Sequence, residues 1–211
     1  GGMRFGDTTT SHNWTLATGS GGVLTLAVNA GTPQIDVANQ TTTITAVVAG
    51  TQGLTKSGSG QLLLNALNTY SGDTTISAES GTLEISGTGN LGNGTYAGAI
   101  DIGSGSTLRY SSSAVQTLGG AISGSGAITK STGTNMLTLS GTNTSFTGSV
   151  TVNSGSLVLG HVNALSSAGV ITLAGGTTLS PSVQNAVLSA PITLAVPAPA
   201  RTAGSAVDST M

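Results

Sequence analysis

Two stretches decide the fold: residues 53–64 read GLTKSGSGQLLL, and residues 127–139 read AITKSTGTNMLTL. Their shared Thr-Lys-Ser triplets lie 74 residues apart. The likeness continues downstream, because SGTLEI at residues 80–85 returns as SGSLVL at residues 154–159. Repetition of whole stretches at so long a period is typical of a stacked architecture rather than of a series of hairpins.

The segments within and around these repeats alternate apolar and polar residues, which is the pattern of half-buried β-strands. The alternation occurs at residues 23–28, 100–102, 108–110, 149–152 and 156–159. Gly, Asn, Ser and Pro cluster between such segments roughly every 8 to 12 residues, a spacing that indicates an all-β chain. No stretch sustains the apolar period of an amphipathic helix, so we expect almost no helix.

A sandwich or a barrel could use such strands too, but two-residue Asn-Gly or Asp-Gly turns between matched strands are missing. We therefore predict a parallel β-helix (β-solenoid), in which stacked strands lie about 4.8 Å apart. At roughly 20 to 25 residues a coil, the chain makes about nine coils and a rod about 45 Å long. The predicted solenoid covers residues 1–195, with repeat units around 53–87 and 127–161 and partial units at both ends; residues 196–211 are a Pro/Ala-rich tail or edge segment.

The composition excludes several classes of function. Among 211 residues, 6% are charged, with five Lys or Arg and seven Asp or Glu, whereas ordinary soluble domains carry about a quarter. Five scattered cations form no basic footprint for phosphates, so we expect no nucleic-acid partner. No apolar run approaches the about 20 residues of a transmembrane segment. Cysteine is absent, which excludes disulfides and thiolate metal sites.

The line from Gly53 to Ile85, together with its second copy, resembles the passenger-associated strand repeat of bacterial autotransporters. Residues 163–173 are similar to the segment that follows that repeat. The resemblance covers most of residues 50–179 and, more faintly, the stretch from Trp14 to Ala49. It implies a right-handed β-helix that is secreted and lies extracellularly or at the bacterial outer cell surface. It implies no activity.

No candidate catalytic set stands out. His12 and His161 are the only histidines and are far apart in the chain, and no Gly-x-Ser-x-Gly motif presents a nucleophile. Residues 87–92 match Gly-x-Gly-x-x-Gly, but neither the helix start nor the acidic residue of a dinucleotide site follows, so we interpret them as a turn. We expect no enzymatic activity, no metal and no cofactor.

One pair of carboxylates has a spacing that hydrolysis could use. Glu84 and Asp101 lie roughly one coil apart and could stack on one face, as glycoside hydrolysis requires. Because only 3% of the residues are aromatic, no sugar-binding groove accompanies them. We therefore favour solvated strand residues.

Lys56 and Lys130 recur at equivalent places. They could form a charged ridge that contacts an acidic partner, or point outward before a turn and discourage strand-edge pairing; we favour the second interpretation. Tyr70 and Phe146 also correspond, and we expect both to fill the interior or a corner of a coil. Residues 132–135 read TGTN where the first copy has Gly-Ser-Gly, which predicts a rebuilt turn.

The apolar column of a solenoid is open at both ends unless something covers it. The candidate self-association residues at these ends are Phe5, Trp14, Ile192, Leu194 and Val196. Flanking coils of a longer chain could cover them, or another copy could add its edge strand.

These observations favour a structural, non-enzymatic segment of a secreted bacterial surface protein that acts as a rigid stalk or adhesin scaffold. Two alternatives stay open. One is a self-assembling extracellular filament subunit that stacks through its open ends. The other is a carbohydrate-binding adhesin, which requires a Trp or Tyr shelf on one face. The expected partners are the chain itself or flanking coils, and a host-surface or glycan receptor.

Overall fold

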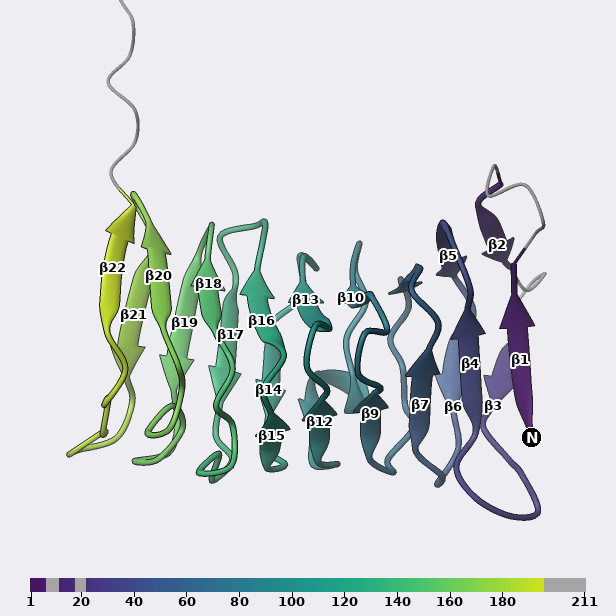
Figure 1. Ribbon diagram of the computed structural model, residues 1–211, viewed down its shortest axis with the longest axis horizontal. Coiled ribbons are helices and arrows are strands. Elements are labelled where there is room, and N and C mark those ends of the chain that lie inside the picture. The colour runs from purple at the N-terminus through teal and green to yellow at the C-terminus, as the bar shows by residue number, and fades with distance from the viewer. Residues whose placement is uncertain (7–11, 18–21, 196–211) are drawn as a thin grey trace, which may run out of the picture.

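The computed structural model is a parallel β-solenoid, a row of short strands stacked along one axis (Figure 1). It describes residues 1–6, 12–17 and 22–195. Every strand pair among these residues is parallel. The predicted all-β solenoid is confirmed.

The strands lie on three faces of the rod, which we call face 1, face 2 and face 3. Face 1 is a six-stranded sheet with the order β1 (Gly2–Phe5), β4 (Gln34–Val37), β7 (Leu54–Ser57), β9 (Thr74–Ile76), β12 (Ile100–Ile102) and β15 (Ile122–Gly124). Face 2 is a nine-stranded sheet with the order β2 (Trp14–Leu16), β5 (Thr41–Ile44), β8 (Gln61–Leu64), β10 (Thr82–Ile85), β13 (Thr107–Tyr110), β16 (Ala127–Lys130), β18 (Val150–Val152), β20 (Ile171–Ala174) and β22 (Ile192–Ala195).

Face 3 holds two sheets along the same side of the rod. The first pairs β3 (Val23–Thr25) with β6 (Val47–Ala49). The second has the order β11 (Thr95–Tyr96), β14 (Gln116–Leu118), β17 (Met136–Leu139), β19 (Ser156–Leu159) and β21 (Thr178–Pro181). The nine strands of face 2 agree with the predicted number of about nine coils.

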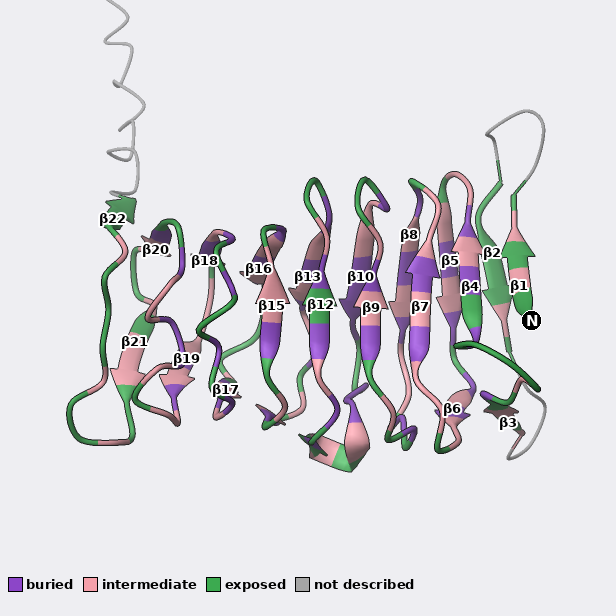
Figure 2. Cartoon of the chain, turned by 60° about the horizontal axis from the view of Figure 1, so that its bottom comes forward, coloured by how far each residue is buried: buried purple, intermediate pink, exposed green. Residues whose placement is uncertain are grey.

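Coil length varies along the rod. Paired strands of face 2 are 20 residues apart in sequence where Thr41 meets Gln61, and 28 apart where Trp14 meets Thr42. Within each strand, alternate side chains point inward, so that Leu62 and Leu64 of β8 are fully buried while Gln61 and Leu63 are half-buried. The buried residues of successive strands form one continuous column (Figure 2). Complete burial of each Leu, Ile or Val side chain stabilises the fold by about 1.5 to 3 kcal/mol.

The helix content is as low as predicted. Among the described residues, the one helix is the single 3₁₀ turn η1 (Gly92–Gly94). The Gly-x-Gly-x-x-Gly match ends where η1 begins, and both Gly87 (φ 60°) and Gly92 (φ 56°) have the left-handed backbone of tight turns. A three-residue helix offers no N-terminal phosphate site, so the interpretation as a turn is confirmed. No helix of the described residues has the length and hydropathy to span a bilayer.

The two sequence repeats do not start on the same face. The first begins with β7 on face 1 and continues with β8 on face 2, whereas the second begins with β16 on face 2 and continues with β17 on face 3. From β7, three coils lead along face 1 to β15, and β16 then lies one face further on. The 74-residue period therefore covers three coils plus one face. Equivalent residues of the two repeats consequently lie on different faces of the rod.

Candidate functional sites in the corners and at the ends

Lys56 and Lys130 point into the solenoid. Lys56 is 0% exposed and Lys130 is 1% exposed. Each lies two residues after a buried apolar residue, Leu54 or Ile128, and alternation along the strand therefore directs the lysine inward as well. The charged ridge and the outward guard against edge pairing are both wrong for these two residues.

The Lys56 ammonium sits at the corner between β7 and β8 and holds the backbone of two coils. Its Nζ donates to the carbonyl oxygens of Ser57 (3.0 Å), Gly58 (2.6 Å) and, on the next coil, Ser80. Burial lowers the pKa of Lys56 to about 8, and the nearby carboxylate of Asp36 opposes that shift. Lys56 therefore replaces the hydrogen bonds that these turn carbonyls would otherwise make with water.

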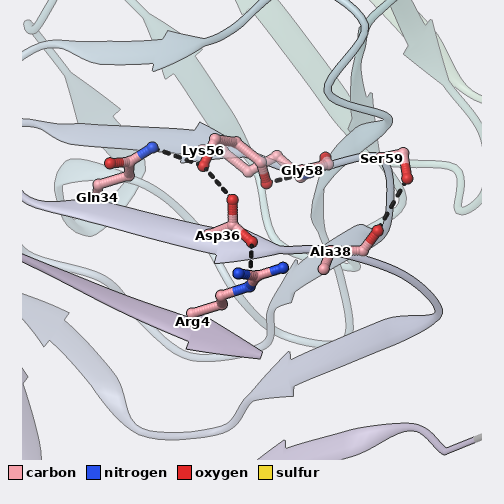
Figure 3. Close-up of polar contacts among 8 residues, drawn as sticks. Arg4, Gln34, Asp36, Ala38, Lys56, Gly58 and Ser59 are labelled. Atoms are coloured by element: carbon pink, nitrogen blue, oxygen red, sulfur yellow. Dashed lines mark hydrogen bonds and ion pairs between the residues drawn. The ribbon is translucent and has the colours of Figure 1, made fainter. Parts of the chain in front are cut away.

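A polar network on the outer side of face 1 lies beside this corner (Figure 3). Arg4 Nε is 3.5 Å from Asp36 Oδ1, and Ser57 Oγ donates to Asp36 Oδ2 at 3.0 Å. Gln34 Nε2 donates to Ser57 Oγ at 2.7 Å. The network joins β1, β4 and β7, so it connects three successive coils across their outward side chains.

Lys130 supports the equivalent corner with different partners. Its Nζ donates to Thr132 O (2.5 Å), Gly133 O (3.4 Å) and Asn135 Oδ1 (2.9 Å). It also lies 5.9 Å from the ring centre of Tyr110. The turn between β16 and β17 spans residues 131–135, whereas that between β7 and β8 spans residues 58–60, so the predicted rebuilt turn is present. Burial lowers the pKa of Lys130 as well.

Tyr70 and Phe146 are fully buried, as predicted. Tyr70 Oη lies 2.9 Å from Thr74 Oγ1, which lies 2.7 Å from Tyr96 Oη, and the Tyr70 and Tyr96 rings meet edge to face at 5.5 Å. In the second repeat the places of Tyr70 and Thr74 are taken by Phe146 and Val150. The polar pair of one copy is thus an apolar pair in the other.

Sequence reasoning missed a set of buried amides that bridge coils. Asn68 accepts from Val48 N–H (3.0 Å) and donates to Asn90 O (3.0 Å). Asn143, at the corresponding place in the second repeat, accepts from Ile122 N–H (2.7 Å) and donates to Ala164 O (3.0 Å). The signal was available, because an Asn stands at the same place in both repeats.

Glu84 and Asp101 do not form a pair, because β10 lies on face 2 and β12 on face 1. Glu84 is buried rather than solvated, lying 3.4 Å from Arg109 Nη1 and accepting hydrogen bonds from Gln61 and Ser111. Asp101 is exposed and accepts from Ser123 Oγ at 2.6 Å.

The remaining candidates for chemistry are not brought together. Nε2 of His161 lies 3.3 Å from Thr142 Oγ1, and its Nδ1 accepts from Asn163 N–H at 3.1 Å. His12 is exposed and lies just before β2, the first strand of face 2. No group of three or more His, Cys, Asp or Glu side chains that could hold a metal occurs in the described part of the chain.

The candidate self-association residues that the structure describes lie on β1, β2 and β22, the end strands of faces 1 and 2. Trp14 is 42% exposed, Ile192 47% and Leu194 71%. Phe5 is half-buried with its ring 6.4 Å from that of Trp14, and Val196 lies outside the described residues. The Tyr side chains, Tyr70, Tyr96 and Tyr110, are buried, so they form no sugar-binding shelf.

The family comparison matches the two repeats. The model of the passenger-associated-transport-repeat covers residues 54–85 and 129–159. The chain carries the passenger repeat of bacterial autotransporters. The passenger repeats contain all three recurring buried features described above: the corner lysine, the corner aromatic and the bridging asparagine.

A curated protein supports the same assignment. The chain is 33% identical over 183 residues to the adhesin BmaC autotransporter of Brucella suis, an alignment that covers 75% of this chain and 5% of that protein. The chain therefore spans about a twentieth of the relative's length. No solved structure matches the chain significantly. Both comparisons thus relate the chain to autotransporters, and the similar curated protein is named as an adhesin.

Proposed function

We propose that this chain is a non-enzymatic spacer of a secreted bacterial surface protein, a rigid stalk that carries or displays an adhesive region outside the outer membrane. The observation that carries the proposal is the uninterrupted nine-stranded sheet of face 2, built partly from passenger repeats. This sheet runs the length of the described solenoid. A force applied at one end is therefore transmitted to the other end through hydrogen-bonded backbone.

The interior supports the proposal because, in the middle of the rod, the enclosed cavity lined by Leu91, Leu108 and Leu118 has a volume of only about 10 Å³. Inward positions hold Leu, Ile and Val, and Lys56, Asn68 and Asn143 tie neighbouring coils through buried hydrogen bonds. Buried polar groups that are fully hydrogen-bonded favour one defined packing over alternatives. A stalk needs this stiffness more than it needs a pocket.

The exterior also supports the stalk proposal, because hydroxyl groups rather than charges keep it hydrated. Outward positions along face 2 carry Thr129, Thr151, Thr172 and Thr193 on four consecutive strands, paired in register. Hydroxyl groups hydrogen-bond water without creating the field of a charged surface. This surface suits an extracellular segment that should not bind oppositely charged molecules unselectively.

Surface display tests the proposal. The chain is placed between a secretion signal and an outer-membrane barrel in a Gram-negative host, with an epitope inserted at the exposed turn between β20 and β21. We expect antibody labelling of intact cells and a passenger that resists external protease. Leu83→Asp, which buries a charge in the column, should abolish resistance, whereas the outward Thr82→Asp should keep it. Retention of the wild-type chain inside the cell, or its rapid digestion at the surface, would contradict the proposal.

A further inference from the structure

The hydrogen-bonded ladder of face 3 is interrupted between its two sheets, at residues 69–71. On one side this segment is bonded to β6, because Thr69 N–H donates to Val48 O at 2.8 Å. On the other side, no backbone hydrogen bond joins it to residues 95–97 of the next coil, and both segments lie within the described part of the chain. Two neighbouring coils therefore meet here without pairing.

The second repeat shows the paired arrangement at the equivalent place. There Gly148 O accepts from the backbone N–H of Gly169 on the next coil at 2.9 Å. In the first repeat, the equivalent Gly72 O accepts instead from the phenol of Tyr96. A side chain thus replaces the ladder bond, and the two backbones stay apart beside it.

The additional chain length that accompanies the interruption forms η1. Asn90 and Asn163 are equivalent, because each backbone carbonyl accepts from the N–H of a bridging asparagine. From Asn90 to Ile100 the chain has two residues more than from Asn163 to Ile171. Within η1, Asn93 has a left-handed backbone (φ 54°, ψ 38°), a conformation that is uncommon outside glycine and is concentrated at functional sites.

A hollow of about 230 Å³ occupies the interruption. It is lined by the exposed side chains of Thr69, Ser71, Asn93 and Thr95 and by the buried rings of Tyr70 and Tyr96. Within the described residues, none of the four exposed side chains has a hydrogen-bond partner, so three hydroxyl groups and one amide are available to a ligand. The lining contains no Lys, Arg, His, Asp or Glu.

Hydrogen bonds hold the walls of the hollow in place. Asn93 N–H donates to Asn68 O at 3.0 Å, which fixes η1 to the preceding coil. Thr74 Oγ1 lies 2.9 Å from Tyr70 Oη and 2.7 Å from Tyr96 Oη, which fixes both rings. A site whose walls are already ordered loses less conformational entropy when it binds a ligand.

We propose that this hollow binds one neutral sugar residue. A pyranose ring carries hydroxyl groups around a compact body, and the hollow offers uncharged hydroxyl and amide groups that both donate and accept. Pockets for drug-sized ligands measure roughly 300 to 1,000 Å³, so the smaller hollow takes a single ring. Phosphate, carboxylate and ammonium groups are bound mainly through opposite charges, which the lining lacks. Because the tyrosines are buried, binding uses hydrogen bonds rather than an exposed aromatic shelf. This inference goes beyond the stalk proposal and does not depend on it.

Chemical-shift titration of the ¹⁵N-labelled chain tests the site. The probes are the methyl glycosides of glucose, galactose, mannose and N-acetylglucosamine, and glycerol is the control polyol. We expect at least one glycoside to give saturable shifts with a millimolar Kd, confined to the backbone amides of residues 69–72 and 92–98. Glycerol at equal concentration should give no saturable shift. A lack of saturation with all four glycosides, saturable shifts elsewhere on the rod, or equal binding of glycerol would overturn the proposal.

Two substitutions remove ligand groups without disturbing the fold. Ser71→Ala deletes a hydroxyl, and Asn93→Gly deletes the amide while keeping the left-handed backbone accessible. The combined variant should raise the Kd at least tenfold. Thr117→Ala is the matched control, because Thr117 pairs in register with Thr95 but lies outside the lining, and its Kd should stay within twofold of the wild type. Equal Kd values for the combined variant and the control, with unchanged far-UV circular dichroism, would contradict the assignment.

A free sugar and the terminal residue of a glycan share this chemistry. Beads coupled to a tetrasaccharide that ends in the bound sugar separate the two sources. Retention that is lost with the combined variant assigns a glycan end, and binding of the methyl glycoside without retention assigns a free sugar. Retention that the combined variant keeps would count against the hollow. None of these results bears on surface display.

Discussion

At the scale of single residues, the corner lysines are the main departure from ordinary solenoid packing. Lys56 fills interior volume with its methylenes and supplies hydrogen bonds to three turn carbonyls with its ammonium group. A fully buried ammonium is costly unless it is hydrogen-bonded on all sides. The lysine therefore stabilises the coil only while its acceptors are held in place, which couples two neighbouring corners.

Truncation of this residue should be costly. Lys56→Ala removes the packed methylenes and leaves three carbonyls without a donor, so we expect the free energy of unfolding to fall by about 2 to 4 kcal/mol. Lys56→Met restores most of the volume and should recover part of that loss. The half-buried outward neighbour Thr55→Ala should change stability by no more than about 0.5 kcal/mol. Urea unfolding followed by circular dichroism measures all three, and equal midpoints for Lys56→Ala and Thr55→Ala would refute the structural role.

The buried amines and phenols together predict an alkaline stability maximum. The pKa of Lys56 is about 8 in the folded chain against 10.5 for an exposed lysine, so between these values the unfolded chain binds the extra proton and the free energy of unfolding rises with pH. Burial raises the pKa of Tyr96 to about 12 from 10.0; ionisation then favours the unfolded chain, and stability falls between about pH 10 and 12.

Urea midpoints measured from pH 7 to 12 should therefore peak near pH 10. Lys56→Met should reduce the rise above pH 8, because one of the two buried amines is gone, and should leave the fall above pH 10 unchanged. A profile that decreases steadily from pH 7 would show that the Lys56 amine has an ordinary pKa in the folded chain.

At the scale of strands and turns, alternation in the sequence was sufficient to predict many elements. The segments at 100–102, 108–110, 149–152 and 156–159 are strands with the expected inward residues, while 23–28 contributes only the shorter β3. The same alternation predicts that Lys56 and Lys130 point inward. The sequence analysis instead placed them outward, because lysine side chains are usually solvated. No sequence pattern predicted the burial of Glu84. Its carboxylate is covered by Gln61 and Arg109 from the two neighbouring coils and by Ser111 from the turn that follows β13.

The Tyr70 corner offers a test of coupling within one coil. Tyr70→Phe alone leaves the Thr74 hydroxyl with one partner, and Thr74→Val alone leaves two phenol groups without it, so each should cost about 1 kcal/mol. The double variant recreates the Phe-Val pair that the second repeat uses at Phe146 and Val150. We expect it to be more stable than the sum of the single changes by at least about 0.5 kcal/mol in a double-mutant cycle; strict additivity would show that the two side chains do not act as a pair.

At the scale of the whole molecule, the 74-residue repeat predicted a solenoid but not how the repeats sit on it. Along face 1 the three coils from Leu54 to Ile122 take 20, 26 and 22 residues. The 74-residue period is therefore longer than three coils and ends on the next face. Equivalent residues of the two repeats therefore lie on different faces. The sequence predicts which apolar residues lie near the two ends, whereas their assignment to β2 and β22 required the strand pairing.

The central claim is that successive coils stack in parallel with a fixed register. Distances between pairs of spin labels along face 2 test it most directly. Thr43, Thr129, Thr151 and Thr172 lie in one outward row. Spin labels on cysteine at position 43 paired with 129, 151 or 172 should give distances of about 19, 24 and 29 Å, a steady increase of about 4.8 Å per coil. Distances that fail to increase in this order, as in facing antiparallel sheets, would contradict the account.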